Sequence, residues 1–558
     1  MRKIGLLILL LIIILPFLYL GLKTQVLFKS LKENNNLIKN QLNQKDIKWL
    51  DFNWEELDKN IINLDSYQRK VANLIPGIKS EVQFQDNIKE VISFNKDLKS
   101  GVLAKNIINN NQDYLHQVLK INDLQNYFQN YNLIVLNDFF KDFNIWYQIL
   151  GFDKPKNYLL LYQVPLIARP TGGLITGYSI FTFNKGLESV TFDDILSLDD
   201  LVLTKYIPPE PLRILNNRWL FHDLNWFFDY PHSAKKIIDW YNQTGSSPSL
   251  DGVIMVNTSL IQNLINNLNI DKFQNISIND VFLKGLTSSM NYTGLETNKG
   301  VLITLMNTLF NEIKNTSLDK LLSLQKQLTS DIVNKDFEIY FEDDRLEYYF
   351  DNLNLTGKIS NSQNDYLAVV FNNLSPTFKI NDSSKNISLT TDFSTTTITN
   401  TLIIKEEKKP LNPESYLKIY LPLNSKIIKT EGIYLKDIPN KINYQKLGYV
   451  EDSDISQIEK NKIKDVINQI EIYQEEDKTV IGFWAKPSIK PIKIVYQLPQ
   501  SSSEINKWQL VIQKQSGSNQ KINYHIVLPQ NKKLKPTAFQ FNKPFILSND
   551  IEVNFEFE

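Results

Sequence analysis

The stretch NYLLLYQVPLIARPTGG, residues 157–173, decides how the rest of the chain is interpreted. Residues 158–162 form a short and almost unbroken apolar run, which is typical of a strand that is covered on both faces. Arg169 and the pair Gly172 and Gly173 follow at the far end of this run. Because glycine lets backbone N–H groups approach a ligand closely, a cation beside two glycines predicts a cradle for an anion.

An apolar run near the N-terminus predicts a membrane anchor. Residues 4–22 carry no charge and are just long enough to cross the hydrocarbon core of a bilayer as a helix. No small-x-small cleavage site precedes Lys23, so we expect an uncleaved transmembrane anchor over residues 1–24. Basic residues lie on both sides of the run, so the positive-inside rule does not fix its orientation. Because short N-terminal anchors usually export the long domains that follow, we expect a single-pass protein of the cell membrane. Membrane lipid would surround the anchor, and the bulk of the chain would be extracytoplasmic.

The composition excludes several classes of site and partner. The chain has 558 residues, with 61 Lys and Arg against 61 Asp and Glu, so net charge gives no argument for nucleic acid as a partner. The absence of cysteine excludes disulfides, thiolate metal sites and a cysteine nucleophile. The chain also has no Walker loop, no GxSxG elbow and no HExxH zinc motif.

The residues after the anchor divide into three parts, so the predicted fold class is multidomain. Residues 25–152 show helical periodicity with few turn residues, broken at Pro76 and Gly77, and predict a membrane-proximal helical stalk or bundle. Residues 153–334 predict an α/β domain, because strands and amphipathic helices succeed one another. Residues 335–558 contain β-rich runs separated by Asn, Ser, Gly and Pro, which are typical of one or two β-sandwiches.

Local patterns predict the elements of these parts. A hairpin is expected around residues 184–186, where a turn with glycine separates two β-rich runs, and a helix is expected at residues 233–241. A short strand at residues 253–256 precedes a second helix, which we expect Thr258 to cap. We assign the strand at 336–341 to the β region. The polar residues 452–474 predict a surface helix or an exposed loop. The second helix has one apolar stripe, formed by Leu260, Ile261, Leu264, Ile265 and Leu268.

The stretch HDLNWFFD, residues 222–229, is the second candidate for chemistry. Asp223, Asn225 and Asp229 are oxygen ligands set between large aromatic residues, and carboxylates near a phosphate-binding arginine can hold magnesium. The aromatic residues then form an apolar wall for a lipid-like or sugar-like ligand. A structural alternative stays open. In it Asp223 and Asn225 cap a turn, Asp229 begins the following helix, and Arg169 simply pairs with a nearby aspartate.

Several motifs keep their order along the chain after the anchor. They are YLLLYQ, RPTGG, HDLNWFFDYPHSA, LDGVIMVNTSLIQNLI, ESYLKIYLP, KTVIGFWAKP, IVYQLP and WQLVIQKQSG. Together they resemble a bacterial envelope family, the domain of unknown function 4012. This resemblance covers most of the chain after the anchor and implies a membrane-anchored envelope protein.

The chain also resembles, more weakly, the LytR-CpsA-Psr enzymes, which move glycopolymers from a polyprenyl pyrophosphate carrier to the cell wall. They share an anchor, a strand followed by an arginine-bearing turn, and an α/β core. The resemblance implies a phosphotransferase in which Arg169 holds pyrophosphate and Asp223 or Asp229 helps to hold Mg²⁺. The expected catalytic residues are Arg169, Asp223 and Asp229, the expected metal ligands are Asp223 and Asp229, and the expected ligand-binding residues are Thr171, Gly172, Gly173, His222 and Asn225.

Two functional hypotheses of different classes follow. In the leading one, the α/β domain binds, and in an enzymatic version transfers, an anionic cell-wall glycopolymer or its polyprenyl-phosphate carrier with Mg²⁺ as cofactor. In the alternative, the protein is a non-catalytic structural or adhesion protein of the cell surface. The leading hypothesis requires that the Arg169 turn and the 222–229 loop converge at the rim of one sheet and face an open cleft.

Overall fold

The structure is a computed structural model of the whole chain. The predicted anchor, residues 1–24, lies outside the residues that it describes. Within the described part of the chain, none of the helices is long and apolar enough to span a membrane. The described residues are 49, 52–60, 76–100, 102–108, 111–128, 134–270, 273, 277–283, 304–309, 311–313, 315–375, 384–406, 415–485, 491–502, 506–530, 532–535, 539 and 543–558.

The central unit is a five-stranded mixed sheet in the order β3-β2-β1-β4-β5. Strand β1 pairs in parallel with β4, and the other neighbours are antiparallel. Apolar residues of β1 alternate between two hydrophobic clusters: Leu160 contributes to one and Leu161 to the other. The prediction of a strand covered on both faces is therefore confirmed. The strands are β1 (Lys156–Arg169), β2 (Gly172–Phe183), β3 (Leu187–Asp194), β4 (Gly252–Asn257) and β5 (Phe337–Phe341).

Helices cover both faces of this sheet. Helix α10 (Tyr230–Gln243) packs on one face, and α11 (Thr258–Leu268) and α15 (Leu318–Val333) pack on the other. All five residues of the predicted apolar stripe of α11 are buried. The N-cap of α11 is Asn257 rather than Thr258, one residue earlier than the sequence predicts. The predicted hairpin between β2 and β3 is confirmed. Short helices follow β3: α9 (Leu196–Leu201), η4 (Glu210–Ile214) and η5 (Phe221–Asp223).

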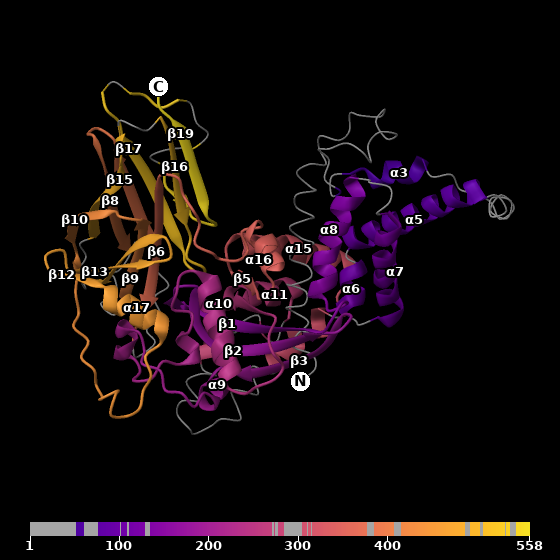
Figure 1. Cartoon of the computed structure of the whole chain (residues 1–558), viewed down its shortest axis with the longest axis horizontal. Coiled ribbons are helices and arrows are strands. Elements are labelled where there is room, and N and C mark those ends of the chain that lie inside the picture. The colour runs from indigo at the N-terminus through magenta and orange to yellow at the C-terminus, as the bar shows by residue number, and fades with distance from the viewer. Residues whose placement is uncertain are drawn as a thin grey trace.

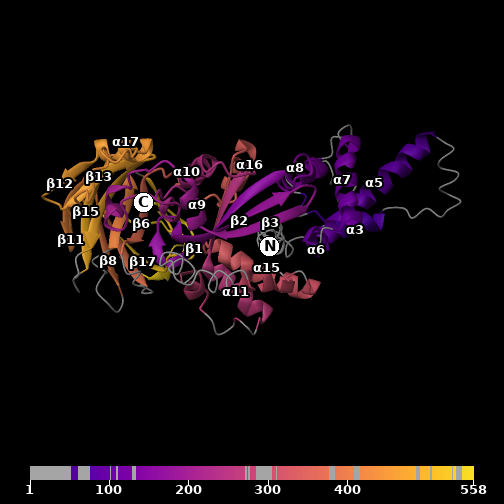
Figure 2. The ribbon, with the colours of Figure 1, turned by 90° about the horizontal axis from the view of Figure 1, so that it is seen from below.

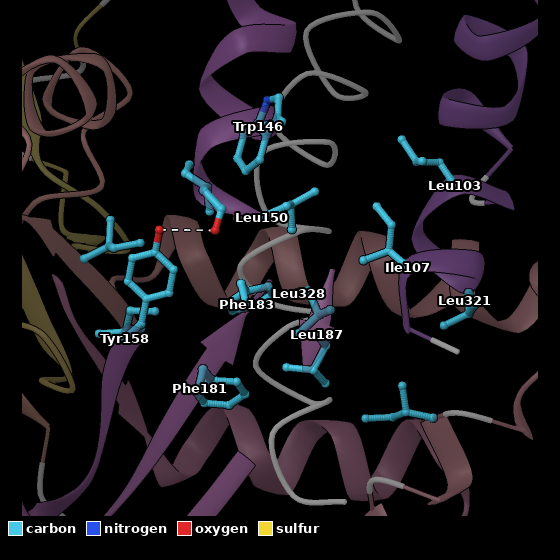
Figure 3. Close-up of a cluster of buried hydrophobic side chains, with 14 of the residues drawn as sticks. Leu103, Ile107, Trp146, Leu150, Tyr158, Phe181, Phe183, Leu187, Leu321 and Leu328 are labelled. Atoms are coloured by element: carbon cyan, nitrogen blue, oxygen red, sulfur yellow. Dashed lines mark hydrogen bonds between the residues drawn. The ribbon is translucent and has the colours of Figure 1, made fainter. Parts of the chain in front are cut away.

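The N-terminal helices pack directly onto the central unit. Figure 1 and Figure 2 show them at the end of the molecule that is opposite to the β-sandwich. Their buried side chains belong to the same hydrophobic cluster as those of the central sheet. Figure 3 shows where the two parts meet: the hydroxyl of Tyr158 in β1 donates to the carbonyl of Ile149, 3.2 Å away. The helices therefore share the core of the α/β unit. They are α3 (Trp54–Asn60), α5 (Pro76–Lys99), α6 (Val102–Ile108), α7 (Gln112–Phe128) and α8 (Ile134–Ile149).

The α/β unit extends further along the chain than the sequence predicts. The strand that we assigned to the β region is β5, which pairs with β4 and completes the first sheet. Helix α16 (Asp344–Asp351) follows it, and Phe350 of this helix is buried in the same cluster. Alternation of apolar residues is the same in a central-sheet strand and in a sandwich strand, so the sequence pattern does not distinguish them.

The C-terminal part is one sandwich of two mixed sheets, whose strands Figure 1 shows. One hydrophobic cluster contains residues of both sheets. The first sheet, in order, contains β10 (Lys426–Glu431), β15 (Ile492–Ser501), β8 (Thr397–Glu406), β7 (Lys385–Asp392), β17 (Gln520–Val527) and β18 (Phe545–Ile546). The second contains β12 (Ile463–Asp465), β13 (Ile470–Glu475), β14 (Lys478–Ala485), β9 (Ser415–Pro422), β6 (Asp365–Asn373), β16 (Lys507–Gln513) and β19 (Ile551–Glu556), with β11 (Ile433–Tyr434) beside β14.

The polar segment 452–474 only partly follows its prediction. Its first half is the helix α17 (Ser453–Asn461), which begins at the N-cap Asp452. Its second half is the β12–β13 pair, which extends the edge of the second sandwich sheet. The segment also contacts the α/β unit, because Lys236 of α10 donates to Asp452 over 2.8 Å.

Candidate functional site

The turn after β1 is shaped by close packing around its two glycines. Gly172 has a φ of +137°, and a Cβ atom there would lie 2.0 Å from Oε1 of Gln163 and 2.6 Å from Oδ1 of Asn257. A Cβ atom on Gly173 would lie 2.1 Å from the carbonyl of Val164. The N–H of Gly173 donates to Oε1 of Gln163 over 2.9 Å. The packing of β1 therefore explains both glycines, and the N–H expected to cradle an anion has a partner inside the protein.

The side chain of Arg169 lies at the junction of the first sheet and the sandwich, and only 1% of it is exposed. Its Nε donates to Oδ1 of Asp223 over 2.6 Å, and its Nη1 donates to the carbonyl of Asn373 in β6, also over 2.6 Å. The carbonyl of Arg169 accepts from Nε2 of Gln515, 2.8 Å away, in the segment after β16. The arginine thus joins three parts of the chain.

His222 extends this ion pair into a buried chain of alternating charges. Its Nε2 lies 3.3 Å from Oδ2 of Asp223, and its Nδ1 lies 3.6 Å from Oδ2 of Asp199. Burial lowers the pKa of His222, but the charges of Asp223 and Asp199 outweigh this effect and raise the pKa to about 9. Burial likewise raises the pKa of Asp223, but the charges of Arg169 and His222 hold it well below its ordinary value. Two cations and two carboxylates therefore compensate one another inside the protein.

Two further predicted ligand-binding residues lie beside this chain of charges and are also buried. Nδ2 of Asn225 donates to the carbonyl of Gly173 over 2.9 Å and so ties the 222–229 loop to the start of β2. Oγ1 of Thr171 donates to the sulfur of Met255 in β4 over 3.1 Å. The Arg169 turn and the 222–229 loop therefore do converge at the rim of the sheet. Packed side chains close this rim where the sequence analysis expected an open cleft.

Asp229 has a separate role. It is the N-cap of α10: its Oδ2 accepts from the N–H of His232 over 3.2 Å, and its Oδ1 accepts from the N–H of Ile359 over 2.8 Å. Burial raises the pKa of Asp229 to about 6, against the effect of the Ile359 hydrogen bond. Asp229 lines another cleft, of about 610 Å³, together with His232 and Glu476.

The two aspartates do not fit the magnesium site that the sequence suggests. Arg169 and His222 take the two oxygens of Asp223, and two backbone N–H groups take those of Asp229. Mg²⁺ takes oxygen ligands in near-octahedral geometry, whereas these carboxylate oxygens are directed to donors of the protein. No cluster of three or more His, Cys, Asp or Glu residues suited to a metal ion occurs in the part of the chain that the structure describes.

An open cleft does lie next to the Arg169 turn, on the side away from the 222–229 loop. It has a volume of about 400 Å³, and Gly172, Asp336 and Lys514 are among its lining residues. A detectable signal was the run QSGSN, residues 515–519, a serine and glycine turn that follows a predicted strand. Its position against the first sheet depends on contacts across more than 300 residues, such as that of Gln515 with Arg169.

The comparisons with known proteins agree with the motifs of this region. No curated protein and no solved structure matches the chain. The model of the family described as a protein of unknown function, DUF4012, matches residues 153–272. This range contains strands β1 to β4, the Arg169 turn, the 222–229 loop and helices α10 and α11. Residues 153–272 of this chain are accordingly a DUF4012 domain.

Proposed function

We propose that this protein is a non-catalytic structural or adhesion protein of the cell surface, in which the DUF4012 domain and the β-sandwich act as one rigid body. The observation that carries this proposal is the buried position of Arg169, which bonds Asp223 in its own domain and the carbonyl of Asn373 in the sandwich. An arginine that holds pyrophosphate must present its donors to a ligand, whereas this arginine directs them into the protein.

Aromatic contacts across the same junction support the proposal of a rigid body. Trp226 of the 222–229 loop stacks on Tyr416 of β9, with ring centroids 6.2 Å apart. The ring centroid of Phe228 in the same loop lies 5.1 Å from that of Tyr420 in β9. Two of the aromatic residues that were expected to form a wall for a lipid-like or sugar-like ligand therefore pack against the sandwich, whereas Phe227 stacks on His232 of α10. Such contacts bury large apolar surfaces and resist relative movement of the two units.

The location at the cell surface rests on the N-terminal sequence. The uncharged run at residues 4–22 has the length of a membrane-spanning helix, and more than 500 residues follow it. In our proposal this run holds the protein in the membrane as a single span, the rest of the chain is extracytoplasmic, and cell-wall polymer is its partner. Protease added to intact cells should then degrade the chain after residue 24, whereas an inward orientation would leave that part protected until lysis.

One binding experiment separates the structural role from the phosphotransferase. Full-length protein in detergent is incubated with a polyprenyl pyrophosphate lipid, with and without Mg²⁺, and separately with purified cell-wall fragments. We expect the protein to sediment with the wall fragments and to show no magnesium-dependent binding of the lipid. The same outcome is expected for Arg169→Lys and for the exposed control Arg345→Lys. Magnesium-dependent lipid binding that Arg169→Lys abolishes, at an unchanged melting temperature, would overturn the proposal.

A further inference from the structure

A cleft of about 400 Å³ lies where the DUF4012 domain meets the sandwich, beside the Arg169 turn. It is close to the ends of the parallel strands β1 and β4, because Gly172 in its wall packs against Gln163 of β1 and Asn257 of β4. The carboxyl ends of parallel strands are where mixed sheets bind ligands, and the volume is within the range of small-molecule sites. The sandwich supplies the opposite wall through the segment after β16.

The wall of this cleft combines neutral polar side chains with small apolar surfaces. Amides and hydroxyls line it, including Asn279, Asn519 and Ser548, and these groups both donate and accept hydrogen bonds. The side chains of Pro165 and Leu166 add apolar surface at the edge of the first sheet. A sugar ring has the matching pattern, with hydroxyls that donate and accept around its rim and C–H groups on its faces.

Three charged side chains lie in the same wall, those of Asp336, Lys514 and Lys385. Nζ of Lys514, a residue that is 4% exposed, donates to the carbonyl of Asn334 over 2.8 Å. Burial lowers the pKa of Lys514 to about 8, against the charge of Asp336, and burial raises the pKa of Asp336. Groups whose pKa values are displaced in this way gather at functional sites. Asp336 repels an anion that Lys514 and Lys385 attract, so the charges of the wall are compatible with a neutral or an acidic ligand.

A buried amide behind the wall has unused hydrogen-bonding capacity. Nδ2 of Asn257 donates to Oδ1 of Asp336 and to Oγ of Ser516, each 3.0 Å away, and both acceptors line the cleft. Oδ1 of Asn257 is buried and has no hydrogen-bond partner in the part of the chain that the structure describes. Unsatisfied buried polar atoms are rare in folded proteins, and this one belongs to a side chain that lies directly behind two residues of the cleft wall.

We propose that this cleft binds one or two sugar units of a surface polysaccharide. Asn519 and Ser548 would bond the sugar hydroxyls, Asp336 and Lys514 would supply one charged acceptor and one charged donor, and Pro165 would contact a ring face. This proposal goes beyond the structural role of Arg169 and does not depend on it, because the arginine directs its donors away from the cleft. It identifies the surface with which an adhesion protein contacts its polymer.

The test uses the full-length protein in detergent and an array of neutral and uronic-acid-containing oligosaccharides, followed by titration of the best binder. We expect at least one saccharide to bind and to slow amide hydrogen exchange at residues 514–519. The saccharides that bind, whether neutral or acidic, identify the class of polymer that the cleft recognises. If no saccharide on the array binds, or if exchange at residues 514–519 stays unchanged on binding, the proposal is overturned.

Two substitutions at the rim locate the bound sugar. Asn519→Trp and Ser548→Trp each fill the cleft from a position that is exposed or half-buried, so neither variant disturbs the core. Each is expected to weaken binding by about tenfold or more, which corresponds to a difference of about 1.4 kcal/mol. Asn506→Trp, an exposed position before the other end of β16, is the matched control and should bind like wild type. Equal affinity in all three variants would contradict the assignment to this cleft, whatever the result of the phosphate-lipid experiment.

Discussion

Nε of Arg169 lies 2.6 Å from Oδ1 of Asp223, and the side chains of the two residues are 1% and 3% exposed. They come from the end of β1 and from η5, which are 54 positions apart in the sequence. An ion pair enclosed in this way is costly to break, because removal of one partner leaves the other charge buried and unpaired. The consequences of this arrangement can be measured.

Replacement of Arg169 should destabilise the whole protein. Arg169→Met leaves the Asp223 carboxylate buried beside His222 only, and we expect the free energy of unfolding to fall by about 3–5 kcal/mol in urea titrations. The matched control is Arg345→Met, which removes a pair with Asp343 whose arginine side chain is 73% exposed. That change should have little effect on stability, because solvent screens an exposed ion pair. Similar decreases in the free energy of unfolding for the two variants would show that the buried ion pair of Arg169 does not stabilise the fold.

The imidazolium of His222 should make stability fall as pH rises from neutral. Its pKa in the folded protein is about 9, above the unfolded value of about 6.5, so folding binds a proton between these two values. The stabilisation is complete below about pH 6.5 and is lost as pH rises through 9, at up to about 1.4 kcal/mol per pH unit. Urea unfolding at a series of pH values from 6 to 10 measures this slope.

Two histidine variants identify the source of that slope. His222→Gln should flatten the pH dependence of stability between neutral pH and pH 9, because the titrating group is gone. His116→Gln, at an exposed position of α7, should leave the wild-type slope in place. If wild type and His222→Gln give parallel profiles, the folded protein does not hold the histidine as a cation.

Gly172 should tolerate a methyl group much less well than another glycine with positive φ. Gly172→Ala introduces a Cβ atom 2.0 Å from Gln163 Oε1, and the strain of overpacking adds about 1–3 kcal/mol to the cost of the φ angle. Gly245 has a φ of +69° and no atom within 4 Å of such a Cβ atom, so Gly245→Ala reports the backbone cost alone, about 1 kcal/mol. Thermal unfolding compares the two variants. Equal decreases in melting temperature would mean that the turn has room for a Cβ atom at Gly172.

The N-terminal helices and the α/β unit should unfold together. Trp146 of α8 lies edge-on to Phe350 of α16, with ring centroids 5.9 Å apart, inside the shared cluster. Trp146→Ala should cost about 3–5 kcal/mol and shift one cooperative transition that includes both parts. Tyr348→Ala, at a position that is 70% exposed, is the control and should have little effect. Two separate calorimetric transitions, with only the first one shifted, would instead indicate an independent helical stalk.

Local patterns carried enough information to predict most elements, but not how they assemble. The run at residues 158–162 and the stripe of α11 reflect periodicities that a short window contains, and the structure confirms both. The assignment of β5 to the first sheet depends on its pairing with β4, more than 70 positions earlier in the sequence. The single sandwich likewise depends on β6 pairing with β16, far along the chain. Pairings over such separations leave no trace in a single sequence.

The candidate site, too, could be predicted only in part from the sequence. The ion pair of Arg169 with Asp223 was among the predicted alternatives. The burial of Arg169, however, is due to Asn373 and Gln515, which lie 204 and 346 positions away. The identities of these residues do not reveal that they cover the arginine, because one contributes only its backbone carbonyl and the other is a common polar side chain.

The most direct test of the structural role of Arg169 is a double-mutant cycle. Urea titrations measure the free energy of unfolding of wild type, Arg169→Met, Asp223→Asn and the combined variant. The cycle isolates the interaction between the two side chains from the other effects of each substitution. If the buried ion pair stabilises the fold, the coupling free energy should be about 2–3 kcal/mol. The double variant should then be clearly more stable than the summed decreases in unfolding free energy of the two single variants imply. A coupling within about 0.5 kcal/mol of zero would contradict the account and would leave Arg169 available for a ligand.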